Sequence, residues 1–196
     1  MKNLYLLRHA KSSWDNPALE DHDRPLARRG MQAAARMGSY IALADVRPDL
    51  VLCSSAARAV QTLEAIEVAI GIGGFLGELK VEDGLYGARA ADLLARLQGL
   101  QDSVGRALVI GHNPALQDLA IALAGHGDRA SLLRLRGKFP TCALATLTIT
   151  GAWADLEAGQ ADLTSLVSPA DLAFEAGGGS PHPQTGLRSS LAGEDS

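Results

Sequence analysis

Two arginines and two histidines in this sequence each follow a short apolar run or open a segment with helical spacing: Arg8, His9, Arg58 and His112. A guanidinium fork binds phosphate oxygens through paired hydrogen bonds and stays charged at any working pH. A neutral imidazole nitrogen can attack phosphorus and form a phosphohistidine. Phosphoryl transfer depends mostly on positioning and charge stabilisation. These residue types therefore predict a phosphate-handling site.

The weight of this prediction comes from the combination rather than from any single residue. His9 follows the apolar run at 3–7, and reactive groups in open α/β sheets collect beyond the carboxyl ends of such strands. A lone histidine there could equally be a strand-end side chain bonded to a backbone carbonyl, and Arg58 alone could be a solvated helix-surface residue. Residue type also leaves open whether His9 is a nucleophile or a base. Four such side chains at comparable positions favour function.

Three ordered segments, LLRHAKSSW, CSSAARAVQT and VIGHNPAL, together resemble the histidine phosphatase superfamily. In that family an RHG or RHA segment, a later S-x-x-x-R-x-x-x-T segment and a downstream GH build one phosphate pocket. The small size and the segments HDRPLARRG and KFPTCALATL make the chain most similar to the SixA-type phosphohistidine phosphatase branch. The resemblance covers residues 1–172. Ala10 stands where the superfamily more commonly has glycine, as is frequent in the SixA-type branch.

The resemblance implies a role for each of the four residues. His9 would be the nucleophile that carries the phosphoryl group. Arg8 and Arg58 would clamp its equatorial oxygens. His112 would bind a phosphoryl oxygen opposite the arginines, and would stabilise the transition state further if it is protonated.

Other residues have roles that the sequence leaves open. The superfamily's proton donor lies shortly before a Tyr-Gly or similar pair, and here Asp83 has the favoured spacing, with Glu82 as its neighbour. A solvated acidic pair at a strand end fits the sequence as well, and a phosphohistidine substrate makes only a modest demand for a proton. Arg24 could reach the phosphate from its loop, or could pin that loop to a carboxylate. We expect His22 and His126 at the surface.

Short apolar runs alternate with helical segments, which predicts an α/β fold with a mainly parallel sheet. The resemblance implies a three-layer α/β/α arrangement of the phosphoglycerate mutase type. Strands are predicted at 3–7, 50–53, 79–83, 106–110 and 143–149, with an edge strand at 161–167, and helices at 25–44, 55–70, 88–100 and 115–124. Asn113 and Pro114 suit the N-cap and the first position of the last helix. Ser54 is expected at the pocket rim and Thr62 in helix packing.

Length and composition limit the remaining choices. The 196 residues fit one domain, predicted at 1–172, followed by a Gly-, Ser- and Pro-rich disordered tail at 173–196. The formal net charge of −4 argues against nucleic acid and anionic membranes as partners. No apolar run reaches the length of a membrane helix or a signal peptide. Cys53 and Cys142 are expected as buried thiols of a cytoplasmic protein.

The spacing of residues in the sequence argues against cysteine phosphatase, dinucleotide-binding and metal-dependent chemistry. Cys53 and Arg58 are separated by four residues, whereas the cysteine phosphatase loop needs five. The glycine-rich segment 71–77 lacks the G-x-G-x-x-G pattern and follows a predicted helix instead of a strand. No His, Cys and carboxylate cluster has metal-ligand spacing, so neither a metal nor another cofactor is expected.

The segment between Arg58 and His112 is already filled by predicted helix, strand and helix, which leaves little for a capping insertion. An open pocket would admit a phosphorylated side chain on a protein surface. We therefore predict a monomeric phosphohistidine phosphatase acting on histidine-phosphotransfer proteins. A phosphatase of small phosphomonoesters is the alternative within enzymes. A non-catalytic phosphate-recognition module is the alternative from another class, although a binder would not need to retain His9.

Overall fold

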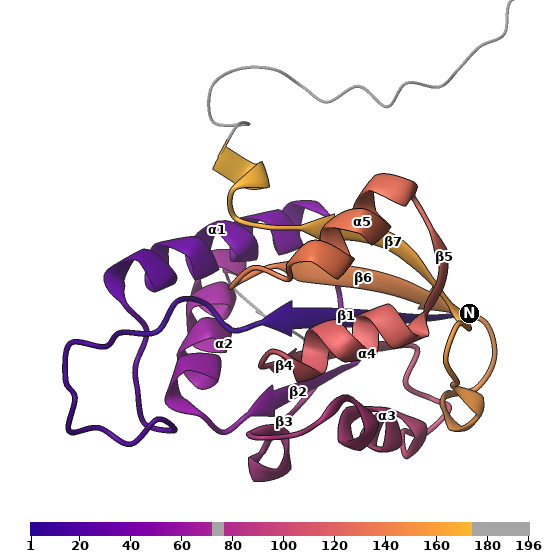
Figure 1. The fold of residues 1–196 in the computed structure, drawn as a ribbon, viewed down its shortest axis with the longest axis horizontal. Helices are drawn as coiled ribbons and strands as arrows, with labels where there is room; N and C mark the ends of the chain where they lie inside the picture. The colour runs from indigo at the N-terminus through magenta and orange to yellow at the C-terminus, as the bar shows by residue number, and fades with distance from the viewer. Residues whose placement is uncertain (72–76, 174–196) are drawn as a thin grey trace, which may run out of the picture.

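The computed structural model describes residues 1–71 and 77–173 (Figure 1). Most of the glycine-rich break predicted at 71–77 lies outside the described residues. The predicted tail at 173–196 does so too, apart from Ala173, which ends a 3₁₀ turn.

A seven-stranded sheet with the order β3-β2-β4-β1-β6-β7-β5 forms the centre of the described fold (Figure 1). The strands are β1 (Lys2–Arg8), β2 (Leu50–Ser54), β3 (Glu78–Glu82), β4 (Arg106–Gly111), β5 (Ala124–Gly127), β6 (Leu144–Ile149) and β7 (Ala161–Val167). Within this part of the chain β6 alone runs against the others, since it pairs antiparallel with β1 and β7 while the remaining pairs are parallel. The prediction of a mainly parallel α/β fold is confirmed.

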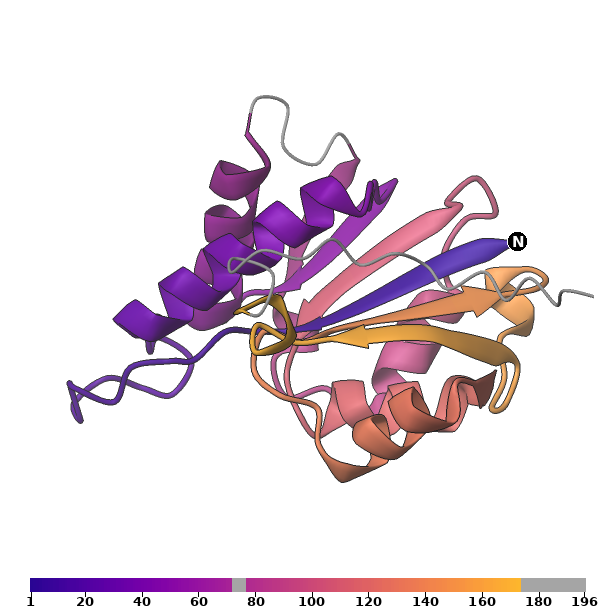
Figure 2. The same cartoon turned by 90° about the horizontal axis from the view of Figure 1, so that it is seen from above.

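Helices cover both faces of the sheet and make the three layers (Figure 2). They are α1 (Arg28–Leu43), α2 (Ala57–Ile70), α3 (Ala90–Gln98), α4 (Ala115–Leu123) and α5 (Arg129–Gly137). Alternate side chains of β1 enter the two cores: Leu4 and Leu6 pack with residues of α3, α4 and α5, whereas Leu7 packs with residues of α1 and α2. Burial on both faces explains why the strands are apolar runs. None of the described helices is both long and apolar enough to cross a membrane.

Two glycines that would weaken α1 as an isolated helix are required by its packing. A Cβ on Gly38 would lie 2.7 Å from the Cβ of Ala69 and 2.8 Å from the carbonyl oxygen of Ile66, so the glycine lets α1 and α2 approach closely. A Cβ on Gly30 would collide with the carbonyl oxygen of Lys11. The second contact places the start of α1 directly against the loop that follows β1.

Two predictions about how helices start are wrong, for local reasons. The first helix begins at Arg28 instead of residue 25, because Leu26 forms a β-bridge with Ser12 and keeps the preceding chain extended. Asn113 does not cap α4: its amide donates to the Oε1 of Gln117 at 3.0 Å and to the Phe139 carbonyl at 3.4 Å.

The strand β7 is not an edge strand, because the unpredicted β5 pairs with it on the outer side. The helix α5 was also not predicted. It is capped by Asp128, whose carboxylate accepts hydrogen bonds from the backbone N–H groups of Ala130 and Ser131.

Candidate active site

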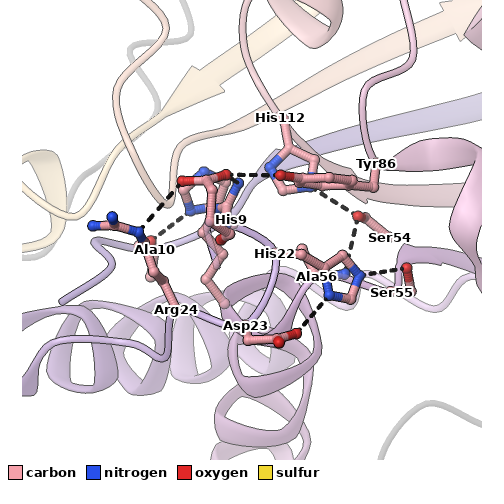
Figure 3. Close-up of polar contacts among 12 residues, drawn as sticks. His9, Ala10, His22, Asp23, Arg24, Ser54, Ser55, Ala56, Tyr86 and His112 are labelled. Atoms are coloured by element: carbon pink, nitrogen blue, oxygen red, sulfur yellow. Dashed lines mark hydrogen bonds and ion pairs between the residues drawn. The ribbon is translucent and has the colours of Figure 1, made fainter. Parts of the chain in front are cut away.

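The carboxyl ends of β1, β2 and β4 lie side by side and bring the predicted site residues together. Arg8 is the register partner of Gly111, and the N–H of His9 donates to the Gly111 carbonyl at 3.0 Å. The residues that follow these two strands, His9 and His112, therefore meet at one edge of the sheet. Their ring centroids are 5.0 Å apart (Figure 3).

His9 is held as a neutral side chain, and one of its ring nitrogens has no hydrogen-bond partner in the part of the chain that the structure describes. It is 9% exposed, and its Nδ1 lies 2.7 Å from the carbonyl oxygen of Ala10. A carbonyl oxygen only accepts hydrogen bonds, so Nδ1 carries the proton and Nε2 keeps its lone pair. Burial, together with the charges of Arg58 and Arg8, lowers the pKa of His9 to about 4, against the opposing effect of the Ala10 hydrogen bond. At neutral pH the ring can act as a nucleophile.

His112 is the second neutral imidazole of the site. Burial first, and then the proximity of His9 and Arg58, lowers its pKa to about 3. Its Nε2 lies 2.8 Å from the Oγ of Ser54, a fully buried hydroxyl at the end of β2. Its Nδ1 is buried and has no hydrogen-bond partner among the described residues. Nδ1 therefore keeps an unused hydrogen-bonding capacity within the described chain, and an anion bound beside the ring would raise the pKa of His112.

Arg58 lies in the first turn of α2, with its side chain 9% exposed. The guanidinium donates to the backbone carbonyl of Asp21 and to its carboxylate, the latter at 3.0 Å. Thr62, one turn later, donates its hydroxyl to the Arg58 carbonyl at 2.6 Å and accepts from the N–H of Ala10 at 3.0 Å. Thr62 therefore fixes the start of α2 to the chain immediately after His9.

Arg8 is anchored differently. Its Nη1 donates to the Phe139 carbonyl at 2.8 Å, and its Nε is buried without a hydrogen-bond partner among the described residues. Burial lowers the pKa of the Arg8 guanidinium. The charge of Arg8, like that of Arg58, also lowers the pKa of both histidines, so the two arginines act on the same pair of rings.

Asp21 is the residue of this site that the sequence interpretation missed. Its carboxylate accepts the hydroxyl hydrogen of Tyr86 at 2.9 Å and pairs with Arg58. Partial burial would raise the pKa of Asp21, but the Tyr86 hydrogen bond and the Arg58 charge outweigh it and hold that pKa below its usual range. Asp21 is therefore ionised at neutral pH and serves as a counter-ion. The only sequence signal was its place in the loop segment DHDR, three residues before Arg24.

The rest of the loop lines the rim of the site. Arg24 stacks on the Trp14 ring at 3.7 Å, lies 3.7 Å from the Asp21 carboxylate, and keeps its Nε and Nη1 buried without hydrogen bonds to described residues. His22 was expected at the surface. Its side chain is 38% exposed, lies 3.0 Å from the Ser55 hydroxyl and packs edge-on against Tyr86 (Figure 3).

The two candidate proton donors are not joined to this cluster. Glu82 is bound to Arg96, with the shortest nitrogen–oxygen distance 2.7 Å. Asp83 is exposed at the start of a 3₁₀ helix (Asp83–Leu85), and within the described chain no hydrogen bond or ion pair involves its carboxylate. Its role as a proton donor stays a prediction.

The thiol of Cys53 is excluded as a nucleophile at neutral pH. It is fully buried, and burial raises its pKa to about 12. Cys53 and Cys142 are both free, as predicted. Within residues 1–71 and 77–173, no three His, Cys, Asp or Glu side chains are grouped so that they could hold a metal ion.

Comparisons with known proteins agree with the motifs. Residues 4–86 match the model of the histidine phosphatase superfamily (branch 1). An uncharacterized protein of Mycobacterium tuberculosis is 38% identical over 165 residues, which cover 83% of this chain and 99% of that protein.

Among solved structures, the inferred phosphohistidine phosphatase SixA from Nakamurella multipartitia is 33% identical, with a TM-score of 0.72. The match covers 86% of this chain and 96% of that one. The protein histidine phosphatase SixA complexed with tungstate is 25% identical with a TM-score of 0.69, over 87% of this chain and 99% of that chain.

Proposed function

The chain belongs to the SixA-type branch of the histidine phosphatase superfamily, and we propose that it hydrolyses phosphohistidine on a protein through a phosphohistidine intermediate at His9. The observation that carries this proposal is the state of His9. Its ring is neutral, its Nδ1 is bound to the Ala10 carbonyl, and its Nε2 has no hydrogen-bond partner among the described residues. The charges of Arg58 and Arg8 act on this ring, and the His112 ring centroid lies 5.0 Å from it, so groups that can stabilise an incoming phosphoryl group are close by.

The reaction proceeds in two steps. In the first, the lone pair of His9 Nε2 attacks phosphorus while the P–N bond of the substrate breaks, and the substrate imidazole takes the bonding pair and a proton from Asp83 or from water. In the second, water attacks the phosphorus of phospho-His9, its proton is released, and inorganic phosphate leaves as His9 recovers its lone pair. Arg8, Arg58 and the Nδ1 of His112 stabilise the charge on the transferring oxygens in both steps.

A phosphoprotein substrate fits the open surroundings of the site. In the described part of the segment between α2 and β4, the chain forms β3, the 3₁₀ helix and α3, and α3 packs against the sheet through Leu93 and Leu97. These elements add no separate domain over the strand ends. An imidazole leaving group also needs a proton less than an alkoxide does, so the reaction tolerates Asp83 as an exposed donor.

The intermediate can be tested by rapid acid or base quenching after mixing the enzyme with a ³²P-labelled histidine-phosphotransfer domain. We expect a labelled enzyme that is acid-labile and base-stable, and that is absent in His9→Ala. His22→Ala is the matched control, because this half-buried histidine packs at the same rim and should still be labelled. An acid-stable adduct, or full labelling of His9→Ala, would contradict the mechanism.

The substrate class is tested by comparing kcat/KM for the phosphorylated phosphotransfer domain with kcat/KM for p-nitrophenyl phosphate and other small esters. We expect the protein substrate to be favoured. A higher kcat/KM on the small esters would replace the proposal with a small-molecule phosphatase. Tight phosphoprotein binding without turnover of any substrate would replace it with a recognition module.

A further inference from the structure

A second group of cations surrounds a cavity of about 560 Å³ beside the active site, hereafter the basic pocket. Its charged lining residues are Arg8, Lys11, Arg29 and Lys138. Among the described residues the remaining lining side chains are uncharged, and no carboxylate lines the cavity. Four positive charges facing one cavity are unusual on a chain whose formal net charge is −4.

Separate elements build the basic pocket. Lys11 lies in the loop after β1, Arg29 in the first turn of α1, and Lys138 directly after α5. The N–H of Ala27 donates to the Lys11 carbonyl at 2.9 Å, and Gly30 leaves room for that carbonyl. The first two turns of the 16-residue helix α1 therefore flank the cavity, through Arg29 and Ala33.

The side-chain charges that Lys11, Arg29 and Lys138 bring to the basic pocket are not neutralised by any residue that the structure describes. The side chains of Lys11, Arg29 and Lys138 make no hydrogen bond or ion pair with any residue in 1–71 or 77–173. The carboxylate of Asp171 lies nearby in the chain but is already engaged, with Arg134 at 2.7 Å and with the N–H of Ser168 at 2.7 Å. An anion from outside would therefore meet cations that have no competing partner in this part of the chain.

Arg8 connects the basic pocket to the catalytic residues. It lines the cavity, and its charge also lowers the pKa of the neighbouring His9. Its Nη1 is held by the Phe139 carbonyl, next to Lys138 in the chain. An anion in the basic pocket and a phosphoryl group at His9 would thus lie on either side of one guanidinium.

We propose that the basic pocket binds a second anionic group, a carboxylate or a phosphate, of the same substrate whose phosphoryl group is bound at His9. This inference rests on the proposed phosphatase function and specifies its substrate class. In a phosphoprotein the second group would be an acidic side chain close to the phosphohistidine. In a small molecule it would be a carboxylate or phosphate on the same skeleton.

The test uses the full-length protein with Lys11→Gln, Arg29→Gln and Lys138→Gln, singly and combined. The substrates are two phosphohistidine peptides that differ only in having Glu or Gln beside the phosphohistidine. Because exposed ion pairs are individually weak, we expect each substitution to raise KM for the Glu peptide by about two- to fivefold, and the triple variant by about tenfold or more. We expect kcat to stay unchanged, and KM for the Gln peptide to change by less than about twofold, since no second ion pair is lost there.

The matched control is the triple variant Arg28→Gln, Arg129→Gln and Arg136→Gln. It removes the same number of charges from exposed positions outside the basic pocket, one of them next to Arg29. It should leave the difference between the two peptides intact. An equal effect of both triple variants, or equal effects on both peptides, would overturn the proposal, because general electrostatic attraction would then explain the result.

A second arm separates the two sources of the anion and does not depend on the proposed function. Phosphoserine and phosphoethanolamine differ by one carboxylate, and their binding can be measured by calorimetry without turnover. If the basic-pocket triple variant binds phosphoserine more weakly but binds phosphoethanolamine as before, and KM for the Glu peptide is unchanged, the second anion belongs to a small molecule. If the wild-type enzyme hydrolyses neither peptide, the phosphohistidine function fails, while the phosphoserine comparison still decides whether the basic pocket binds a carboxylate. The inference is overturned if the basic-pocket triple variant alters neither the difference in KM between the Glu and Gln peptides nor the difference in affinity between phosphoserine and phosphoethanolamine.

Discussion

The strand ends and the loop at residues 11–27 meet at the same site but hold their side chains in opposite ways. His9 and Ser54 are buried, and their backbone belongs to or directly continues the sheet. In the loop, the side chains of Asp21 and His22 are 54% and 38% exposed. Segments with few buried contacts open most easily. This difference predicts that the strand ends determine the chemical step, whereas the loop adjusts how strongly the site attracts an anion.

Arg58, which lies in the first turn of α2 just beyond the end of β2, and Arg24 of the loop give the largest contrast. We expect Arg58→Gln to lower kcat/KM about 100- to 1000-fold, because a preorganised donor to the transition-state oxygens is lost. Arg24→Gln should lower kcat/KM by less than about tenfold, because its guanidinium is held by the Trp14 ring and the weaker, partly solvated pairing with Asp21. Steady-state kinetics on one substrate measure both values.

Thermal unfolding of both variants controls for misfolding, since Arg58 is buried. A folded Arg58→Gln enzyme with nearly normal kcat/KM would abolish the distinction between the two regions. A loss from Arg24→Gln as large as that from Arg58→Gln would move the loop into the group that determines the chemistry.

The pH dependence of stability should report the two buried histidines at the strand ends. Their folded pKa values, about 4 for His9 and about 3 for His112, lie below the usual value of 6.5. As the pH falls below 6.5 the unfolded chain binds protons first, so stability that is present above this pH is lost as the pH falls towards 4. Each histidine contributes at most about 1.4 kcal/mol per pH unit, and we expect a combined loss of up to about 4 kcal/mol between pH 7 and pH 5.

Urea unfolding at the two pH values measures this loss. His112→Asn should remove about half of it, whereas His126→Asn is the control, because His126 is 84% exposed and lies away from the site. The carboxylates with lowered pKa, including Asp21, lose their contribution at lower pH and do not distort this window. A pH-independent free energy of unfolding in wild type would show that the two rings are not held neutral by burial.

The sequence predicted the strand-end residues because each follows an apolar run whose end is recognisable locally. The roles expected of Arg8, His9, Arg58 and His112 came from the resemblance to the family. The structure brings these four residues to the same end of the sheet. The sequence did not predict β5. The residues of this strand, AGHG, have no strand pattern, and they pair with β7, which lies far along the chain. Asp21 was missed for the same reason, because its partners Arg58 and Tyr86 are defined only by the folded loop.

Asp21→Asn should have the smallest effect, and it tests the loop side of the comparison most directly. In the free enzyme the Asp21 carboxylate is bonded to the same guanidinium that a phosphoryl group needs. Asn keeps the shape and can still accept the Tyr86 hydrogen bond, but it removes the competing charge. Because the carboxylate is half-exposed, the gain is modest, and we expect the inhibition constant of inorganic phosphate to fall by about two- to fivefold.

The matched control is Asp23→Asn, which removes a loop carboxylate that pairs with His22 and not with Arg58. Its phosphate affinity should stay close to that of wild type, so that the difference between the two variants isolates the pairing with Arg58. Weaker phosphate binding in Asp21→Asn would mean that the carboxylate orients the guanidinium more than it competes for it. In that case the loop would be part of the preorganised site, and the division between rigid strand ends and an adjusting loop would not hold.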